Sequence, residues 1–227
     1  MRRLKFWVRW GLQTIGIAAG AATVYLVINL FSGTMNRGEE SLWGWMLNWY
    51  PIYLLVCGTL VVSIIGISFF QVYISMLMAM NCTRREVTLG GFVTITADLL
   101  VLLCGSALLW GCYPDSFWQS GGSVILPFAA GAMLGVTSLF VALGVAIVRW
   151  GKIGLVLASI GYAVIGGCLG AFFALSGSSL LSDLLGSKAA AGSRLAVGLA
   201  VLAGGAVLYG IAWIFAFFSI RTMQVRA

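Results

Sequence analysis

Long apolar segments alternate with short polar segments along the whole chain. Each apolar segment is about 20 residues long or longer, and the polar segments between them hold most of the charged residues. A helix needs about 20 consecutive apolar residues to cross the hydrocarbon core of a bilayer. The pattern therefore predicts six membrane-spanning helices, at approximately residues 10–31, 52–80, 88–109, 123–148, 153–175 and 195–220.

The second predicted span is longer than one crossing requires. A helix over residues 52–80 rises about 1.5 Å per residue and so exceeds a hydrocarbon core of about 30 Å. Its end should therefore project beyond the membrane or bend along it. Pro51 is suited to the first turn of this helix. Indole rings prefer the headgroup level, so the segment before Pro51 is expected at an interface, on account of Trp43, Trp45 and Trp49.

The composition indicates an integral membrane protein. Hydrophobic residues make up 61% of the 227 residues and charged residues only 8%, whereas soluble domains carry about 45–50% and about 25%. The six spans leave no stretch for a folded soluble domain. We expect a single all-α transmembrane domain over residues 1–227, without a built-in ATPase, kinase or receptor head.

The basic residues divide unequally between the two sides of the predicted membrane. Six spans place both termini on one side, and basic residues collect on the cytoplasmic side. Both termini are therefore predicted to be cytoplasmic. The net charge of +7 follows from this topology, so binding to nucleic acid is not needed to explain it. Ten of the 13 basic residues lie on the side of the termini: Arg2, Arg3, Lys5, Arg9, Arg84, Arg85, Arg149, Lys152, Arg221 and Arg226.

The residue types required for most enzyme chemistry are scarce. The chain has no His and six acidic residues, and its five cysteines show no C-x-x-C spacing. It contains neither the phosphate-binding G-x-x-x-x-G-K-[ST] pattern nor the G-x-S-x-G pattern of serine hydrolases. No catalytic residue, metal site or cofactor site is predicted, and the chain is not expected to be an enzyme.

Asp98 is the only acidic residue within a predicted span. A carboxylate near the middle of a bilayer is costly, so it should be protonated, paired or in contact with water. At helical spacing it shares a face with Gly91, Thr94 and Gly105, a stripe of small and polar residues that suits close helix packing. A proton or cation site and a packing role both stay open. The lack of a second charged group inside the membrane favours packing.

Several glycines recur at the small-xxx-small spacing that lets helix backbones approach closely. The pairs are Gly16 with Gly20, Gly131 with Gly135, and Gly166 with Gly170. This spacing suits packing inside one bundle as well as dimerisation, and packing inside the bundle is the favoured interpretation.

The turn between the second and third spans has features that a membrane anchor does not need. Arg84 and Arg85 would serve as cytoplasmic anchors in any such turn. The helix end before them is overlong and contains Met76, Met78 and Met80, and methionine suits adaptable contact surfaces. An apolar helix end followed by an arginine pair favours docking into a groove on a cytoplasmic partner.

Residues 77–86 read LMAMNCTRRE. They resemble a stretch found in small bacterial ABC-2-type permeases, many of them from Gram-positive bacteria, in which a long second helix ends in a pattern like L-a-l-s-f-G-s-T-R-k-e. The T-R-[KR]-E core is present here as Thr83 to Glu86. Asn81 stands where that family has Gly, and asparagine can also adopt the left-handed backbone. The segment that carries the resemblance, residues 68–92, covers about a tenth of the chain.

The resemblance implies a permease subunit in a bacterial plasma membrane that pairs with a second copy or a sister permease. Separate soluble ATP-binding subunits would hydrolyse ATP. The family resemblance also implies export of peptides, antimicrobials or other hydrophobic compounds. The element that couples the permease to the ATP-binding subunits would comprise Tyr73, Met76, Met80, Asn81, Thr83, Arg84, Arg85 and Glu86.

Two other functions are compatible with the sequence. A self-contained carrier, or a substrate-binding membrane component, would depend on Asp98 together with Thr94. This alternative lacks the paired polar groups or proline-interrupted spans near the midplane that carriers commonly use. The third possibility is a membrane scaffold that transports nothing.

Overall fold

The computed structural model describes residues 2–32, 42–79, 82–112, 122–154, 156, 159–161 and 191–222. Within these residues, every regular element is helical, as the sequence predicted. The elements are α1 (Arg2–Ser32), α2 (Leu42–Ser68), the π-helix η1 (Phe69–Tyr73), α3 (Ile74–Ala79), α4 (Arg84–Gly111), α6 (Gly122–Trp150) and α9 (Ala191–Thr222).

Five of the described helices are long and apolar enough to cross a membrane. Each of them overlaps one predicted span, and only the fifth prediction has no counterpart among them; the second predicted span, 52–80, continues beyond Tyr73, where its candidate span ends. The fifth predicted span, 153–175, lies mostly outside the described residues. The five candidate spans are Lys5–Phe31, Trp49–Tyr73, Arg84–Gly111, Leu126–Trp150 and Leu195–Arg221.

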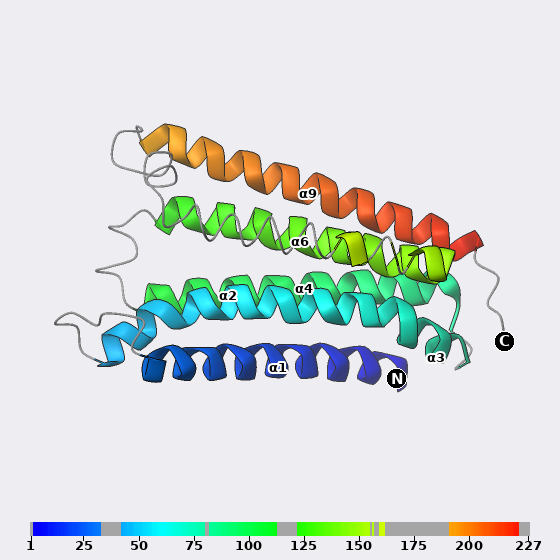
Figure 1. Ribbon diagram of the computed structural model, residues 1–227, viewed down its shortest axis with the longest axis horizontal. Helices are drawn as coiled ribbons and strands as arrows, with labels where there is room; N and C mark the ends of the chain where they lie inside the picture. Colours follow the sequence, from blue (N-terminus) through cyan, green and yellow to red (C-terminus); the bar gives the residue numbers. More distant parts are fainter. Residues whose placement is uncertain are drawn as a thin grey trace.

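The long helices lie side by side in an elongated bundle (Figure 1). α2 and α4 pack against each other at its centre, α1 packs against both, and the closely paired α6 and α9 complete the other side. The first turn of α1 and the last turn of α9 lie at the same end of the bundle. α6 and α9 run in the same direction, because residues 122 and 191 both lie at the opposite end.

The chain turns back directly after α6. Gly151 has φ +57° and its N–H donates to the Ile147 carbonyl at 2.9 Å, which is the left-handed glycine cap common at helix ends. A side chain at Gly154 would meet the carbonyl of Ala146, so the following residues fold back against α6. This agrees with the very short turn predicted between the fourth and fifth spans.

The start of the second helix differs from the prediction. α2 begins at Leu42, so Pro51 lies inside the helix and not in its first turn. Hydropathy locates the apolar part of a helix, whereas the helix itself continues into the less apolar segment before it. Proline inside a membrane helix is tolerated where neighbouring side chains compensate the interrupted backbone. The Ser106 hydroxyl of α4 donates to the Pro51 carbonyl at 3.3 Å, which ties α4 to this part of α2 but does not replace the N–H that proline lacks.

The overlong second helix changes register before it ends. The π-helix η1 separates α2 from α3, and the path bends at α3 (Figure 1). The adjacent Phe69 and Phe70 are both completely buried, with 0% and 1% of their surfaces exposed. Phe69 lies against Trp10 of α1 at 5.5 Å between ring centroids, and Phe70 lies against Trp213 of α9 at 5.9 Å. The wider π turn thus accompanies the packing of neighbouring aromatic side chains against two different helices.

Small residues bring α6 and α9 into backbone contact. A Cβ atom on Gly131 would overlap the backbone of Val201, and one on Gly205 would overlap the carbonyl of Gly131. Gly131 therefore serves packing inside the bundle, as expected. Gly135, Gly16 and Gly20 have nothing within 4 Å of such an added atom, and Gly166 and Gly170 lie outside the described residues.

Candidate functional site at the basic end

One end of the bundle carries most of the basic residues of the described helices, whereas Arg194 lies in the first turn of α9 at the other end. This basic end contains the first turns of α1 and α4 and the last turns of α6 and α9 (Figure 1). The folded structure thus brings together, at one end, the charges that the sequence assigned to one side of the membrane, except Arg226, which lies outside the described residues. The basic residues there whose side chains are described are Lys5, Arg9, Arg84, Arg85, Arg149, Lys152 and Arg221.

The T-R-R-E segment begins α4 with a capping box. Thr83 has an extended backbone, with φ −72° and ψ 149°. Its hydroxyl accepts a hydrogen bond from the Glu86 N–H at 3.2 Å, and the Thr83 N–H donates to Glu86 Oε2 at 2.9 Å. The two N–H groups lie at the start of α4, where no preceding helical turn offers a carbonyl, so these bonds supply their partners. The spacing of Ser or Thr and Glu before an apolar run is itself the sequence signal for this cap.

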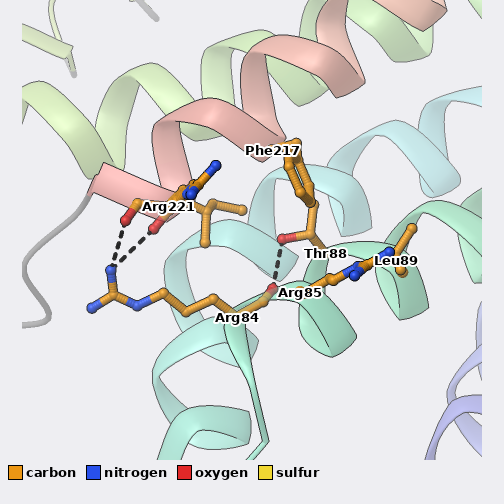
Figure 2. Close-up of a pocket in the computed structure, with 7 residues that line it drawn as sticks. Arg84, Arg85, Thr88, Leu89, Phe217 and Arg221 are labelled. Atoms are coloured by element: carbon orange, nitrogen blue, oxygen red, sulfur yellow. Dashed lines mark hydrogen bonds between the residues drawn. The ribbon is translucent and has the colours of Figure 1, made fainter.

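Arg84 is half-buried, and its side chain is held by the end of another helix. Its Nη1 donates to the Arg221 carbonyl at 3.0 Å and to the Ile220 carbonyl at 3.4 Å (Figure 2). The last carbonyls of a helix have no partner within the helix, and they form its negative end. Arg149 of α6 adds a second contact, donating to the Ser219 hydroxyl at 3.1 Å. Arginines from α4 and α6 thus hold the last turn of α9.

A cavity of about 590 Å³ lies beside this contact, between α4 and α9. Arg84 and Arg85 come from the first turn of α4, and Arg221 comes from the last turn of α9 (Figure 2). Thr88 uses its hydroxyl to bond the Arg84 carbonyl at 2.9 Å. The complete lining is Arg84, Arg85, Thr88, Leu89, Phe217, Ile220 and Arg221. The sequence reasoning did not find this cavity, because its two walls are more than a hundred residues apart.

The predicted coupling residues have different positions in the fold. Tyr73 is half-buried, with its ring 5.4 Å from Trp10 and 6.2 Å from Phe6, so it packs η1 against α1. Met76 is 42% exposed. Met80 and Asn81 lie outside the described residues. The predicted coupling residues exposed at the basic end are Met76, Thr83, Arg85 and Glu86.

The predicted polar pair inside the membrane faces α1. Asp98 is 4% exposed and Thr94 is 8% exposed. A Cβ atom on Gly11 would lie 2.9 Å from Asp98 Oδ1 and 3.4 Å from the Thr94 methyl group, so the helices approach closely here. The Thr14 hydroxyl, on the same helix as Gly11, donates to the Trp10 carbonyl at 3.0 Å. Asp98 thus has a buried, closely packed position near the middle of α4.

Other polar side chains connect helices that the sequence could not pair. The hydroxyls of Thr96 on α4 and Tyr209 on α9 are 2.9 Å apart. Ser63 on α2 and Thr137 on α6 are 3.4 Å apart, and both side chains are fully buried. Such contacts are expected where hydroxyl groups have no access to water.

The fold and composition define a multi-pass helical membrane protein. No protein-family model matches the chain, and neither a curated protein nor a solved structure matches it.

Proposed function

We propose that this protein is the membrane-spanning permease subunit of an ATP-driven ABC transporter in a bacterial plasma membrane. The observation that carries the proposal is the short α3 followed by the capped start of α4 at the basic end. These two elements present Met76, Arg85 and Glu86 outward. An ATP-binding subunit would dock on the surface that these three side chains form.

The arrangement of the helices supports the proposed topology. Because α6 and α9 run in the same direction, the chain between them has to return along the bundle, which favours a sixth crossing. An even number of crossings agrees with the two ends of the described chain lying together. Positive residues mark the cytoplasmic side of membrane proteins, so the basic end would face the cytoplasm and the soluble subunits.

The connection between α3 and the core supports a coupling role. η1 directly precedes α3 and contains two buried aromatic residues, Phe69 and Phe70. Phe69 contacts α1, and Phe70 contacts α9. A displacement of α3 by an ATP-binding subunit would therefore act on both sides of the bundle. The export of peptides, antimicrobials or hydrophobic compounds, and pairing with a second copy or a sister permease, are part of the same proposal.

The test is purification of the tagged protein from its native cells in a mild detergent, with mass spectrometry of the proteins that accompany it. Arg85→Glu should reduce the amount of the soluble ATP-binding subunit, because Arg85 is exposed on that surface. Lys152→Glu is the matched control, since it makes the same charge change at the same end but on another turn. Arg84 is left unchanged, because it holds α9.

Two outcomes would count against the permease. One is an undiminished ATP-binding subunit with a correctly inserted Arg85→Glu protein. The other is the absence of any ATP-binding subunit from the wild-type sample when such subunits are expressed in the cells. Correct insertion is checked in each case by labelling a single cysteine placed at the basic end, because charge changes also affect orientation.

The burial of Asp98 favours a second candidate function, a self-contained carrier that moves protons. Asp98 is 4% exposed and lies beside Gly11 and Thr14 in the middle of the span. Buried ionisable groups in membrane helices commonly mark proton or ion pathways. The test is proton uptake by protein-containing vesicles under an imposed membrane potential, followed with a pH-sensitive dye. Asp98→Asn should abolish uptake and Ser106→Ala should leave it unchanged; equal uptake by both variants would exclude this function.

A further inference from the structure

We propose that the cavity between α4 and α9 binds the phosphate headgroup of an acidic phospholipid, with an acyl chain lying along Leu89 and Phe217. The inference is independent of the transport function, because it depends only on the cavity and its position in a membrane helix bundle. Basic pockets between membrane helices are suited to acidic lipid headgroups.

The charges around the cavity favour an anion. Arg84, Arg85 and Arg221 line it, and none of the described residues that line it is acidic. Glu86 follows Arg85 directly, but its Oε2 accepts the Thr83 N–H in the capping box. Arginine has five N–H donors, and the described bonds of Arg84 use Nη1 alone. Its remaining donors can therefore contact a phosphate.

Arg84 also removes an obstacle to anion binding. The C-terminal carbonyls of α9 would repel a phosphate, because they form the negative end of that helix. Two of them, from Ile220 and Arg221, accept hydrogen bonds from Arg84. The positive end of α4 lies on the other side of the cavity. The local field around the cavity is thus positive despite the nearby helix end.

The apolar part of the lining points to a lipid in preference to a free phosphate. Leu89 lies five residues further into α4 than Arg84, about 7.5 Å along the helix axis. Phe217 lies four residues before Arg221, about 6 Å deeper in the bundle. Leu89 is 47% exposed. The cavity therefore has cationic groups at the end of the helices and apolar groups toward the membrane interior, which is the order of headgroup and acyl chain in a lipid.

The volume is also adequate. About 590 Å³ falls within the range of about 300–1,000 Å³ typical of small-molecule sites. A phosphate with its glycerol occupies only part of such a space. The remainder can hold the first methylene groups of an acyl chain.

The experiment is a titration of the purified full-length protein in a neutral detergent, with bound lipid counted by native mass spectrometry. Dioleoyl phosphatidylglycerol is the acidic lipid, and dioleoyl phosphatidylcholine is the comparison without net charge. The test variant is Arg85→Gln with Arg221→Gln, which keeps the hydrogen bonds of Arg84 to α9. The matched control is Lys5→Gln with Arg9→Gln, which removes two charges from α1 at the same end.

The wild-type protein should prefer phosphatidylglycerol. A basic residue near a membrane surface contributes about fivefold to the binding of an acidic lipid, so the test variant should bind about thirtyfold more weakly. The control should stay within a few-fold of the wild type. Leu89→Asn should weaken lipid binding with all three arginines intact, because it removes the apolar contact with the acyl chain.

A second arm separates the lipid from other sources of phosphate. Inorganic phosphate and glycerophosphoglycerol, which lack acyl chains, are added as competitors and should not displace the lipid. Displacement by either would overturn the lipid assignment. Equal weakening in the test and control variants, or equal binding of the two lipids, would overturn the cavity as a specific site. Thermal unfolding checks that the double variant is folded; if it is not, Arg85→Gln alone is used, with an expected loss of about fivefold.

Discussion

The Arg84 guanidinium donates a hydrogen bond to the main-chain carbonyl of Arg221 at 3.0 Å. It thereby joins the first residue of α4 to the last turn of α9, 137 residues later in the chain. The two neighbouring arginines therefore have different environments: Arg84 is hydrogen-bonded to α9, and Arg85 is exposed. Reversal of both charges would combine loss of docking with loss of an internal contact, so the two arginines have to be changed separately.

Arg84→Gln should destabilise the helix bundle by about 1–2 kcal/mol, because it removes a charged donor from two helix-end carbonyls. Arg85→Gln should change the free energy of unfolding by less than about 0.5 kcal/mol, as expected for an exposed side chain. Unfolding of the purified proteins by increasing SDS fractions in mixed micelles measures both. Similar stabilities of the two variants would show that the contact with α9 contributes little.

Thr83→Ala should cost about 1 kcal/mol by removing the N-cap of α4. Thr83→Ser is the control, because it keeps the hydroxyl that accepts the Glu86 N–H. Hydrogen–deuterium exchange of peptides from the first turn of α4 should be faster in the alanine variant and unchanged in the serine variant. Equal exchange in all three proteins would contradict a stabilising role for the capping box.

Gly131→Ala should separate α6 from α9, because the added methyl group would overlap the Val201 backbone, which has no flexible side-chain end to move. Overpacking of this kind typically costs about 1–3 kcal/mol. Gly135→Ala adds the same group one turn away, where nothing lies within 4 Å. SDS-induced unfolding should therefore distinguish the two alanine variants, and identical curves would exclude the close contact.

Gly11→Ala should destabilise the contact between α1 and α4, because its methyl group would lie 2.9 Å from Asp98 Oδ1. The cost should fall when Asp98 is replaced by the shorter Ser. A double-mutant cycle should give a coupling of about 0.5–3 kcal/mol, as for other residues in direct contact. Gly16→Ala is the control on the same helix, with nothing within 4 Å. Additive effects of the Gly11 and Asp98 changes would contradict the contact.

Part of the site at the basic end was readable from the sequence. The T-x-x-E spacing before an apolar run contains the capping box of Thr83 and Glu86. The sequence favoured a packing role for Asp98 over a proton or cation site, and the structure buries its side chain. By contrast, Tyr73 was assigned to a partner surface, but it packs against Phe6 and Trp10. A half-buried aromatic residue and an exposed one look the same in a sequence, because the facing helix decides which it is.

The class of protein, the approximate positions of the long apolar helices and the gathering of basic charge at one end follow from the amino-acid sequence alone. These properties depend on local composition, since each helix satisfies its own backbone hydrogen bonds and enters the membrane according to its own apolar residues. Three features became visible only in the folded protein: the contact of Arg84 with the end of α9, the contact of Gly131 with Gly205, and the cavity between α4 and α9. Each of these depends on which helices pack together and on their rotation. Within a membrane, small residues and polar contacts between helices determine that choice, because apolar side chains pack equally well against lipid.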